Sequence, residues 1–207
     1  MASSTPIIYD VHTHDMQRGN AVVNLPSCVE IPARGIYSVG LHPWETDRID
    51  DEALRWLREA AACHNVVAIG ETGFDALRGA DMERQEALFR EHASLSAHYG
   101  KPLIIHNVKG TDRIIRLHKE LHPDEPWIIH GFRGKPEMAR QLVREGMYLS
   151  IGEKFNPRSL QEIPAERLLV ESDESAMSAA EIASRAGITL RDVAGLFIRS
   201  EAHADVE

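Results

Sequence analysis

The sequence predicts an α/β fold, a small (β/α)8 barrel of the TIM type with an abbreviated N-terminal third. Short apolar runs rich in Ile and Val recur along the chain, and helical segments separate the later ones. The runs are unbroken rather than alternating, which is typical of strands buried on both faces of a parallel sheet. We expect eight strands, at residues 7–11, 21–25, 36–41, 66–69, 103–105, 127–129, 148–151 and 168–170.

Helix signals lie between the later runs. Residues 50–62 and 82–99 repeat apolar side chains at helical spacing. Thr111 suits the cap of a third helix, and Pro136 and Gly146 suit the first turn and the end of a fourth. Strands that alternate with helices indicate βα units. The second run is the weakest prediction, because too few residues join it to its neighbours for a full crossover helix.

Composition limits the classes of protein that remain. The 207 residues suffice for one domain, which we expect to span 1–207 and to be smaller than the ~250 residues typical of such barrels. A net charge of −9 disfavours nucleic-acid binding by charge alone, unless bound cations offset it locally. Two cysteines without CxxC spacing, no signal-peptide pattern and no apolar stretch near ~18 residues predict a cytoplasmic protein without a membrane span. No obligate protein partner is evident.

Polar side chains end most of the predicted strands. The carboxyl ends of barrel strands converge on one mouth, where catalytic residues lie. We expect Asp10 and Glu171 to point away from that mouth and to support it, and most of the remaining histidines (64, 92, 98, 118, 122 and 203) to be ordinary surface residues. The residues expected at the mouth are His12, His14, His42, Glu71, His106, His130 and Asp173.

The spacing of His12 and His14 indicates a metal site. Residues i and i+2 of a strand point to the same face, so both imidazoles can reach one ion. Imidazole and carboxylate ligands suit Zn, Mn, Co, Ni or Fe, and carboxylates with water also suit Mg. The alternative is that each of these residues is a hydrogen-bonded polar cap at a strand end. The joint pattern over several strands favours the metal site, and a carboxylate such as Asp173 can accept a proton from the attacking water.

The motifs DVHTH, VGLHPW, IGETGFD, PLIIH, IIHGF and LLVESD, in this order, resemble the TatD family of metal-dependent hydrolases, within the amidohydrolase-like barrels. The resemblance covers residues 7–173 and implies a catalytic site with two divalent metal ions (Mg, Mn, Zn, Co or Ni). By motif, it implies that His12 and His14 bind the first ion, Glu71 bridges both, His106 and His130 bind the second, Asp173 touches the first ion and the water, and His42 faces the substrate.

The implied activity is hydrolysis of phosphodiesters in DNA or RNA, often from the 3′ end. The chain departs from the family after strands five and six, where Lys109 and Arg133 stand in place of the usual residues, and it shortens the stretch between His14 and His42. With His42, Lys109 and Arg133 are the candidates for substrate binding, and with Lys135 and Lys154 they favour a phosphate. A nucleic acid or a small phosphoester is the expected substrate. Hydrolysis of an amide or ester and a non-catalytic binding role stay open.

The C-terminal stretch 180–200 allows two interpretations. EIASRAGITLRDV has the spacing of a helix-turn-helix, which would read DNA with Arg185, Arg191 and Arg199. The favoured interpretation is simpler, because a barrel needs a final helix after its eighth strand.

Overall fold

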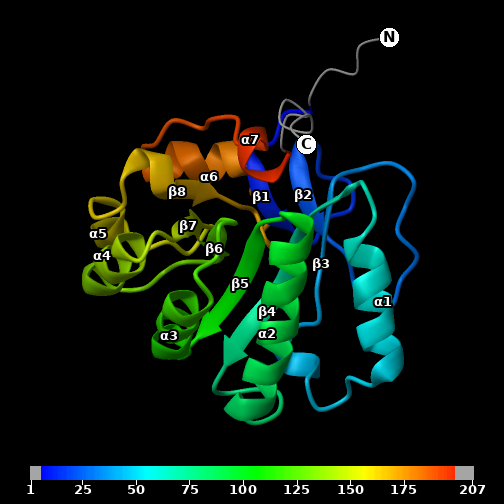
Figure 1. Cartoon of the computed structure of the whole chain (residues 1–207). Helices are drawn as coiled ribbons and strands as arrows, with labels where there is room; N and C mark the ends of the chain where they lie inside the picture. The colour runs from blue at the N-terminus through cyan, green and yellow to red at the C-terminus, as the bar shows by residue number, and fades with distance from the viewer. Residues whose placement is uncertain (1–5, 199–207) are drawn as a thin grey trace, which may run out of the picture.

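The strands close into a barrel. In the computed structural model, which describes residues 6–198, eight parallel strands follow one another in sequence order. A bridge between Thr13 and Asp173 joins the last strand region to the first, and the backbone N–H of Asp173 donates to His12 O at 2.9 Å. Figure 1 shows the helices around the outside of these strands. The predicted (β/α)8 barrel is confirmed.

The elements keep the expected order. The strands are β1 (Asp10–Thr13), β2 (Ala21–Asn24), β3 (Tyr37–Val39), β4 (Val66–Asp75), β5 (Leu103–Val108), β6 (Trp127–Ile129), β7 (Tyr148–Ile151) and β8 (Leu168–Val170). The helices are η1 (Pro43–Glu45), α1 (Asp51–Ala61), α2 (Met82–Tyr99), α3 (Thr111–Leu121), α4 (Pro136–Arg144), α5 (Pro157–Leu160), η2 (Ala165–Arg167), α6 (Ala179–Ala186) and α7 (Ala194–Phe197).

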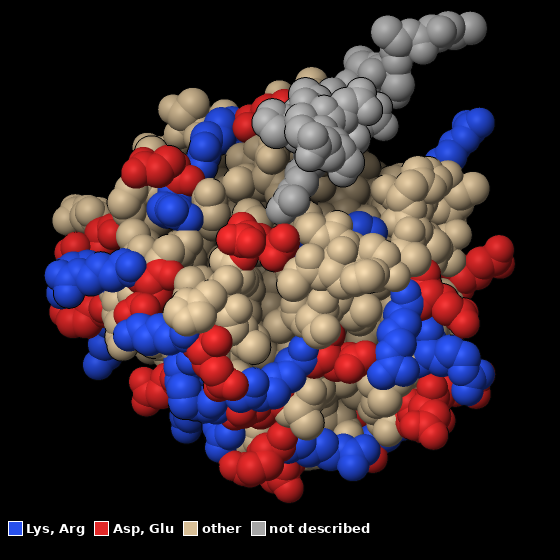
Figure 2. Space-filling view, in the orientation of Figure 1, with Lys and Arg blue, Asp and Glu red and all other residues tan. Residues whose placement is uncertain are grey.

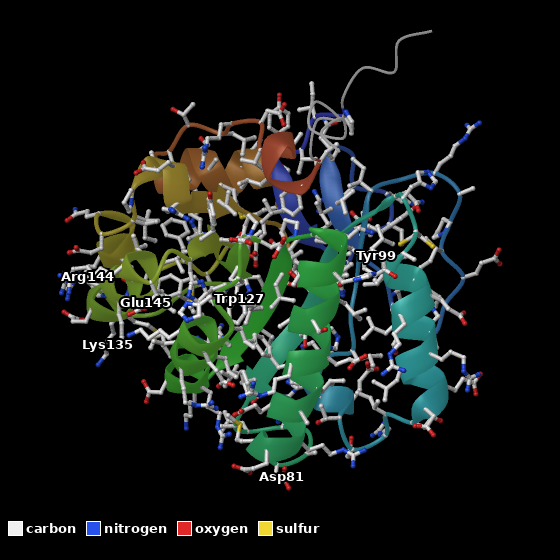
Figure 3. All side chains as sticks on the ribbon, in the orientation of Figure 1. Asp81, Tyr99, Trp127, Lys135, Arg144 and Glu145 are labelled. Atoms are coloured by element: carbon white, nitrogen blue, oxygen red, sulfur yellow. The ribbon has the colours of Figure 1, made fainter. Side chains whose placement is uncertain are left out.

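Local capping explains where the long helix α2 begins and ends. The Asp81 side chain accepts a hydrogen bond from Arg84 N at 2.8 Å, and Gly100 takes the left-handed conformation that ends a helix. Asp81 and Tyr99 mark the two ends of α2 in Figure 3, in which Trp127 lies among the side chains of the interior. The third helix begins at Thr111 itself, and Gly110 occupies the cap position.

The N-terminal third is abbreviated, as predicted. Residues 14–20 and 25–36, all of them described, contain no helix. In place of a helix, Val29 and Ile31 pack with α1 against a core that includes Val23 and Val39. Trp56 Nε1 also donates to Val29 O at 2.7 Å. The second connection therefore covers its strands with an extended segment.

Strand β4 is longer than the apolar run predicts, because it continues from Ile69 to Asp75. Gly70 and Gly73 explain this extension. Both have positive φ, and a Cβ on either would overlap a backbone carbonyl oxygen of β5, that of Ile104 or that of His106. The two glycines let β4 and β5 approach closely along the whole motif, which places Glu71 inside a strand rather than on a turn.

An apolar floor lies beneath the mouth. Ile104 and Ile128 precede His106 and His130 by two residues and so share their strand faces. They are fully buried and pack in one cluster with Leu169 and other residues. The histidines therefore project from a rigid, dry base.

The C-terminal segment closes the barrel and does not form a helix-turn-helix. Val193 N donates to Ile8 O at 2.8 Å, and Phe197 packs in the same cluster as Ile8. Helix α7 has four residues, which is too short for a recognition helix, and Arg191 donates to Glu166 O at 2.9 Å. Arg199 lies outside the described residues. Across residues 6–198, no helix is long and apolar enough to cross a membrane.

Candidate metal centre

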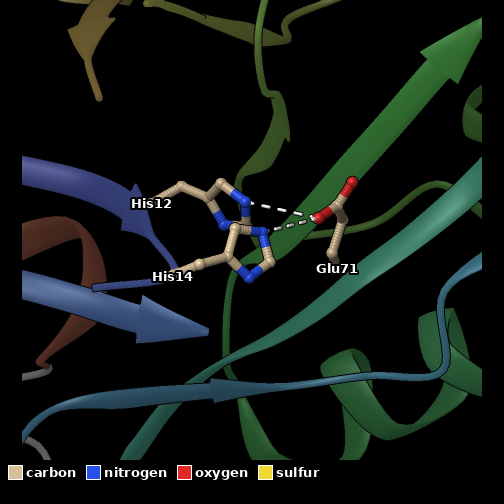
Figure 4. A group of neighbouring side chains, drawn as sticks. All are labelled: His12, His14 and Glu71. Carbon is tan, nitrogen blue, oxygen red and sulfur yellow. Dashed lines mark ion pairs between the residues drawn. The ribbon is translucent and has the colours of Figure 1, made fainter. Parts of the chain in front are cut away.

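Glu71 lies between two groups of histidines, and each of its carboxylate oxygens faces a different group. Oε2 lies 3.3 Å from His12 Nε2 and 3.6 Å from His14 Nε2. Figure 4 shows both imidazoles, from the end of β1, pointing at this carboxylate. Glu71 itself is buried in β4. The i, i+2 spacing therefore brings the pair of imidazoles to one carboxylate oxygen, as the sequence indicates.

The other oxygen faces imidazoles from the neighbouring strands. Glu71 Oε1 lies 2.7 Å from His106 Nδ1, 2.8 Å from His130 Nε2 and 2.9 Å from His42 Nε2. His106 lies within β5, His130 directly follows β6, and His42 comes shortly after β3. Nitrogen atoms from separate strands thus converge on one oxygen that is itself buried.

Asp173 completes the first group. Its Oδ1 lies 3.8 Å from His12 Nε2 and 3.6 Å from His14 Nε2. The residue has φ +51°, a left-handed conformation, and backbone hydrogen bonds to β1 hold it there. Its side chain is 40% exposed, so the carboxylate is accessible from the mouth.

The donor set fits divalent metal ions. Ligand atoms lie within 4.8 Å of one another in the groups His12–His14–Glu71, His12–His130–Asp173 and His42–Glu71–His106. His12 is fully buried, yet neither ring nitrogen has a hydrogen-bonding partner among the residues that the structure describes. Buried polar atoms are rarely left without partners, and a cation beside Glu71 would satisfy Nε2. Imidazole nitrogen and carboxylate oxygen are the ligands of Zn, Mn, Co and Ni sites.

Electrostatics keep Glu71 ionised. Burial alone would raise the pKa of Glu71, but the neighbouring imidazoles of His130, His106 and His12 hold it well below its ordinary value. Burial would likewise lower the pKa of His130, but Glu71 and Glu171 hold it well above its ordinary value. The contact with Glu71 also raises the pKa of His14. The site therefore favours positive charge around the ionised carboxylate of Glu71. A metal cation can supply that charge as well as a proton can.

Residues 11–184 match the family model described as TatD related DNase. The chain belongs to this family. TatD-related proteins similar to it include an uncharacterised metal-dependent hydrolase, YabD of Bacillus subtilis, 33% identical over 66% of this chain and 57% of that protein. The 3′-5′ ssDNA/RNA exonuclease TatD of Cronobacter sakazakii is 31% identical over 72% of this chain and 60% of that protein. The chain spans less than two thirds of the length of these curated relatives.

A solved structure shows the same fold. YjjV, a TatD homologue of Escherichia coli K12, superimposes with a TM-score of 0.72 at 21% identity, covering 87% of this chain and 88% of YjjV. The expected membership of the TatD family is confirmed by the family-model match over residues 11–184.

Glu171 points towards the TatD-related site, not away from it as the sequence analysis expected. It is fully buried, and its Oε1 accepts hydrogen bonds from Gly131 N at 2.7 Å and His130 Nδ1 at 3.2 Å. Its place in the sequence before Asp173 does not predict its direction, because β8 ends at Val170 and Asp173 has a left-handed φ of +51°. Asp10 has a supporting role, since its Oδ1 accepts from His12 N at 3.3 Å and from Ser172 N at 3.0 Å.

Asp75 is a site residue that the sequence analysis missed. Its Oδ2 lies 3.3 Å from His106 Nε2 and accepts a hydrogen bond from Trp44 Nε1 at 2.6 Å. The signal was present in the motif GETGFD, because Asp75 lies four residues after Glu71 and so shares its face of β4. The apolar run ends at Ile69, and for that reason the strand was not extended to Asp75.

A pocket of about 550 Å³ opens beside His130 and Asp173, between the loops that follow β5, β6, β7 and β8. The cationic side chains of Lys109, Arg133 and Lys154 belong to its lining. Lys135, which the sequence analysis grouped with them, precedes α4 and lies outside that lining. The same lining includes the acidic side chains of Glu153, Glu171, Asp173 and Glu174. The mouth of this TatD-related barrel therefore has its candidate ligand histidines next to a pocket of mixed charge, in which three cationic side chains are available to an anion.

Proposed function

We propose that the protein is a two-metal-dependent hydrolase that cleaves phosphodiesters at the ends of DNA or oligonucleotides. The observation that carries the proposal is that the two carboxylate oxygens of Glu71 face different pairs of imidazoles. Oε2 faces His12 and His14, and Oε1 faces His106 and His130. A carboxylate with a separate set of imidazoles at each oxygen is suited to bridge two ions. The similarity to a relative named as a 3′-5′ ssDNA/RNA exonuclease supports the substrate class.

Hydrogen bonds at the far nitrogens support the assignment of ligands. A carboxylate can only accept, so His106 donates from Nε2 to Asp75 and His130 donates from Nδ1 to Glu171. Glu71 can also only accept, so without a metal ion both nitrogens of each ring face a carboxylate. With an ion between Glu71 and the rings, the far nitrogens would keep the protons, and the lone pairs on His106 Nδ1 and His130 Nε2 would face the ion. His106, His130 and Glu71 would hold the second ion, and His12, His14, Glu71 and Asp173 would hold the first.

His42 fits a substrate contact better than a ligand role. Its Nδ1 accepts a hydrogen bond from the backbone N–H of Trp44 at 3.1 Å, so the neutral ring carries its proton on Nε2. A protonated Nε2 cannot bind a metal ion, although it lies within the ligand group with Glu71 and His106. It can donate a hydrogen bond, here to Glu71 Oε1 and, when substrate is bound, to a phosphate oxygen.

Asp173 is placed to act as the general base. When bound, two divalent ions supply a nucleophilic water at neutral pH and neutralise charge on the phosphoryl oxygens. The half-exposed Asp173 carboxylate would orient that water and accept its proton, while Glu71 keeps the two ligand groups together. The substrate phosphate would lie in the adjacent pocket, where Lys109 and Arg133 complement its charge.

The cationic side chains of the pocket support a phosphate substrate in an acidic protein, together with the divalent ions that would offset the nearby carboxylates. Figure 2 shows acidic and basic side chains interleaved over the face that carries α2 and α3, as in the pairs Arg90–Glu120 and Arg113–Glu83. That face offers no continuous basic stripe in the part of the chain that the structure describes. The substrate would therefore be bound at the mouth rather than along the barrel wall.

Metal analysis and turnover test the proposal. The protein is stripped with chelator, reloaded with Mg²⁺, Mn²⁺, Zn²⁺, Co²⁺ or Ni²⁺, and assayed on single-stranded oligonucleotides, a small phosphodiester, an amide and an ester. We expect metal-dependent shortening of the oligonucleotide. The Asp173→Asn variant should retain metal and lose most of the hydrolysis rate. The control variant Asp47→Asn should keep the hydrolysis rate of the wild type. If only the amide or the ester were hydrolysed, that activity would replace the phosphodiesterase assignment. The absence of any metal-dependent hydrolysis would refute the proposal.

A further inference from the structure

We propose that Asp75 is a positioning residue that fixes the orientation of His106 for the second metal ion, and that Trp44 holds Asp75 in that position. The inference rests on the two-ion part of the proposed function. It concerns residues beyond the ligand set, and it assigns a role to the last residue of the motif GETGFD.

The two oxygens of Asp75 have separate partners. Oδ1 accepts a hydrogen bond from Leu77 N at 2.8 Å and so shapes the turn after β4. Oδ2 accepts from Trp44 Nε1 at 2.6 Å and lies 3.3 Å from His106 Nε2. A residue with a structural role alone would need only the first contact. The second oxygen is directed at the far nitrogen of a candidate ligand.

The backbone of Asp75 is fixed independently of its side chain. Gln85 on α2 accepts from Asp75 N at 2.8 Å through Oε1 and donates to Asp75 O at 2.9 Å through Nε2. Gln85 is itself buried. The carboxylate of Asp75 is therefore held between helix α2 and the mouth, and a change confined to this carboxylate should leave the strand in place.

The Asp75 carboxylate acts as an acceptor on both of its oxygens. It accepts from Leu77 N through Oδ1 and from Trp44 Nε1 through Oδ2, and the same Oδ2 faces His106 Nε2. With a metal ion between His106 and Glu71, the carboxylate at Nε2 would hold the ring proton on that nitrogen and leave the lone pair on Nδ1, which lies 2.7 Å from Glu71 Oε1. Asp75 would thus serve His106 as Glu171 serves His130.

Trp44 extends this arrangement to the surface. Its ring is 45% exposed, although Arg78 stacks over it at 4.2 Å from the centroid and His42 and His106 contact it edge to face. An exposed tryptophan with its N–H bonded to a buried carboxylate is held in one orientation. Loss of that N–H would leave Oδ2 with one donor fewer and a looser hold on His106.

Metal titration of the stripped protein tests the proposal without substrate. The variants are Asp75→Asn, whose amide oxygen can replace only one of the two carboxylate oxygens, Trp44→Phe, which lacks the indole N–H, and the control Asp47→Asn, which removes one exposed carboxylate near Trp44. Binding of Co²⁺ is followed by calorimetry and by its visible spectrum. Thermal unfolding of the metal-free proteins reports the fold.

We expect two equivalents in the wild type and the control. In Asp75→Asn, one equivalent should bind about 10- to 100-fold more weakly while the other is unchanged, and Trp44→Phe should shift the same equivalent by a smaller factor. Two unchanged equivalents in both variants, or equal weakening of both equivalents, would overturn the proposal. If Asp75→Asn does not fold, Trp44→Phe decides alone. A wild type that binds two ions but cleaves no phosphodiester refutes the proposed function and leaves this inference standing, whereas a wild type with a single equivalent defeats both.

Discussion

The buried imidazole of His92, on α2, accepts a hydrogen bond from the backbone N–H of Leu41 at 2.9 Å between Nε2 and N. Its other nitrogen, Nδ1, donates to Leu88 O at 2.8 Å. Leu41 directly precedes His42, so this contact ties the helix to the segment that carries a site residue. Most of the remaining histidines are expected at the surface, and His64, His98 and His122 are exposed. His92 is the exception among the described ones, because it is fully buried.

His92 should make stability depend on pH. Burial lowers the pKa of His92 from 6.5 to about 4, so the unfolded chain takes up a proton at a higher pH than the folded protein. Stability is then complete above pH 6.5 and falls as pH decreases towards 4, by about 3 kcal/mol in total and about 2 kcal/mol by pH 5. Urea unfolding of the metal-free protein at pH 7.5 and pH 5 measures this, because the stability gap between wild type and His92→Gln should narrow at pH 5. A gap of equal size at both values, or an equal narrowing for the surface control His64→Gln, would contradict it.

The burial of His92 follows a helical pattern in the sequence. The pattern is concealed because several of its residues are polar. The buried face of α2 includes Gln85, Phe89, His92 and Ser96, at steps of four, three and four residues. Polar residues at helical spacing are usually read as the solvent face. Here the contacts of Gln85 with Asp75 and of His92 with Leu41 convert polar side chains into a docking face for the mouth, and such a contact becomes visible only once helix and strand ends are placed together.

Strand order, helix positions and the set of residues at the mouth could be predicted, because each follows from local periodicity and from the convergence of parallel strands. The details that were missed depend on where a strand stops. The prediction ends β4 at Ile69 and therefore leaves out Asp75. It also directs Glu171 away from His130, which is the wrong side. Both errors concern residues two or four positions from a candidate ligand. Asp75 still lies within β4, whereas Glu171 follows the end of β8, where alternation no longer applies.

Gly73→Ala should damage both the fold and the metal centre. Gly73 has φ +139°, and a Cβ there would overlap His106 O, so β4 and β5 must separate. We expect a loss of at least about 2 kcal/mol in the free energy of unfolding, together with weaker metal binding. Gly195→Ala is the control, since a Cβ at Gly195 meets no described atom within 4 Å. Equal unfolding midpoints for the two variants would show that the close approach of the strands is not needed.

Glu71→Gln should prevent the protein from holding two ions at the same time. The change keeps the size of the side chain but leaves one oxygen, so only one of the two imidazole groups retains an oxygen ligand from position 71 and the bridge between the groups is lost. We expect at most one tightly bound equivalent and an activity at least about 100-fold lower. Elemental analysis after dialysis gives the stoichiometry, with Asp47→Asn as the charge control. Two tightly retained ions in the variant would argue that Glu71 does not bridge them.

Removal of the pocket cations should weaken the binding of a phosphodiester more than it slows the cleavage step. Arg133→Ala and Lys109→Ala each remove a positive charge beside His130 and Asp173, and a lost charged hydrogen bond of about 1.5–3 kcal/mol corresponds to roughly a 10- to 100-fold increase in KM. The Arg133 change should have the larger effect, because a guanidinium can bind two phosphate oxygens. Lys135→Ala, from outside the pocket lining, should leave KM unchanged and so controls for net charge. The KM for an oligonucleotide, measured across a range of salt concentrations, should show a shallower salt dependence for the two pocket variants. A fall in kcat at constant KM would instead place these side chains at the reacting phosphate.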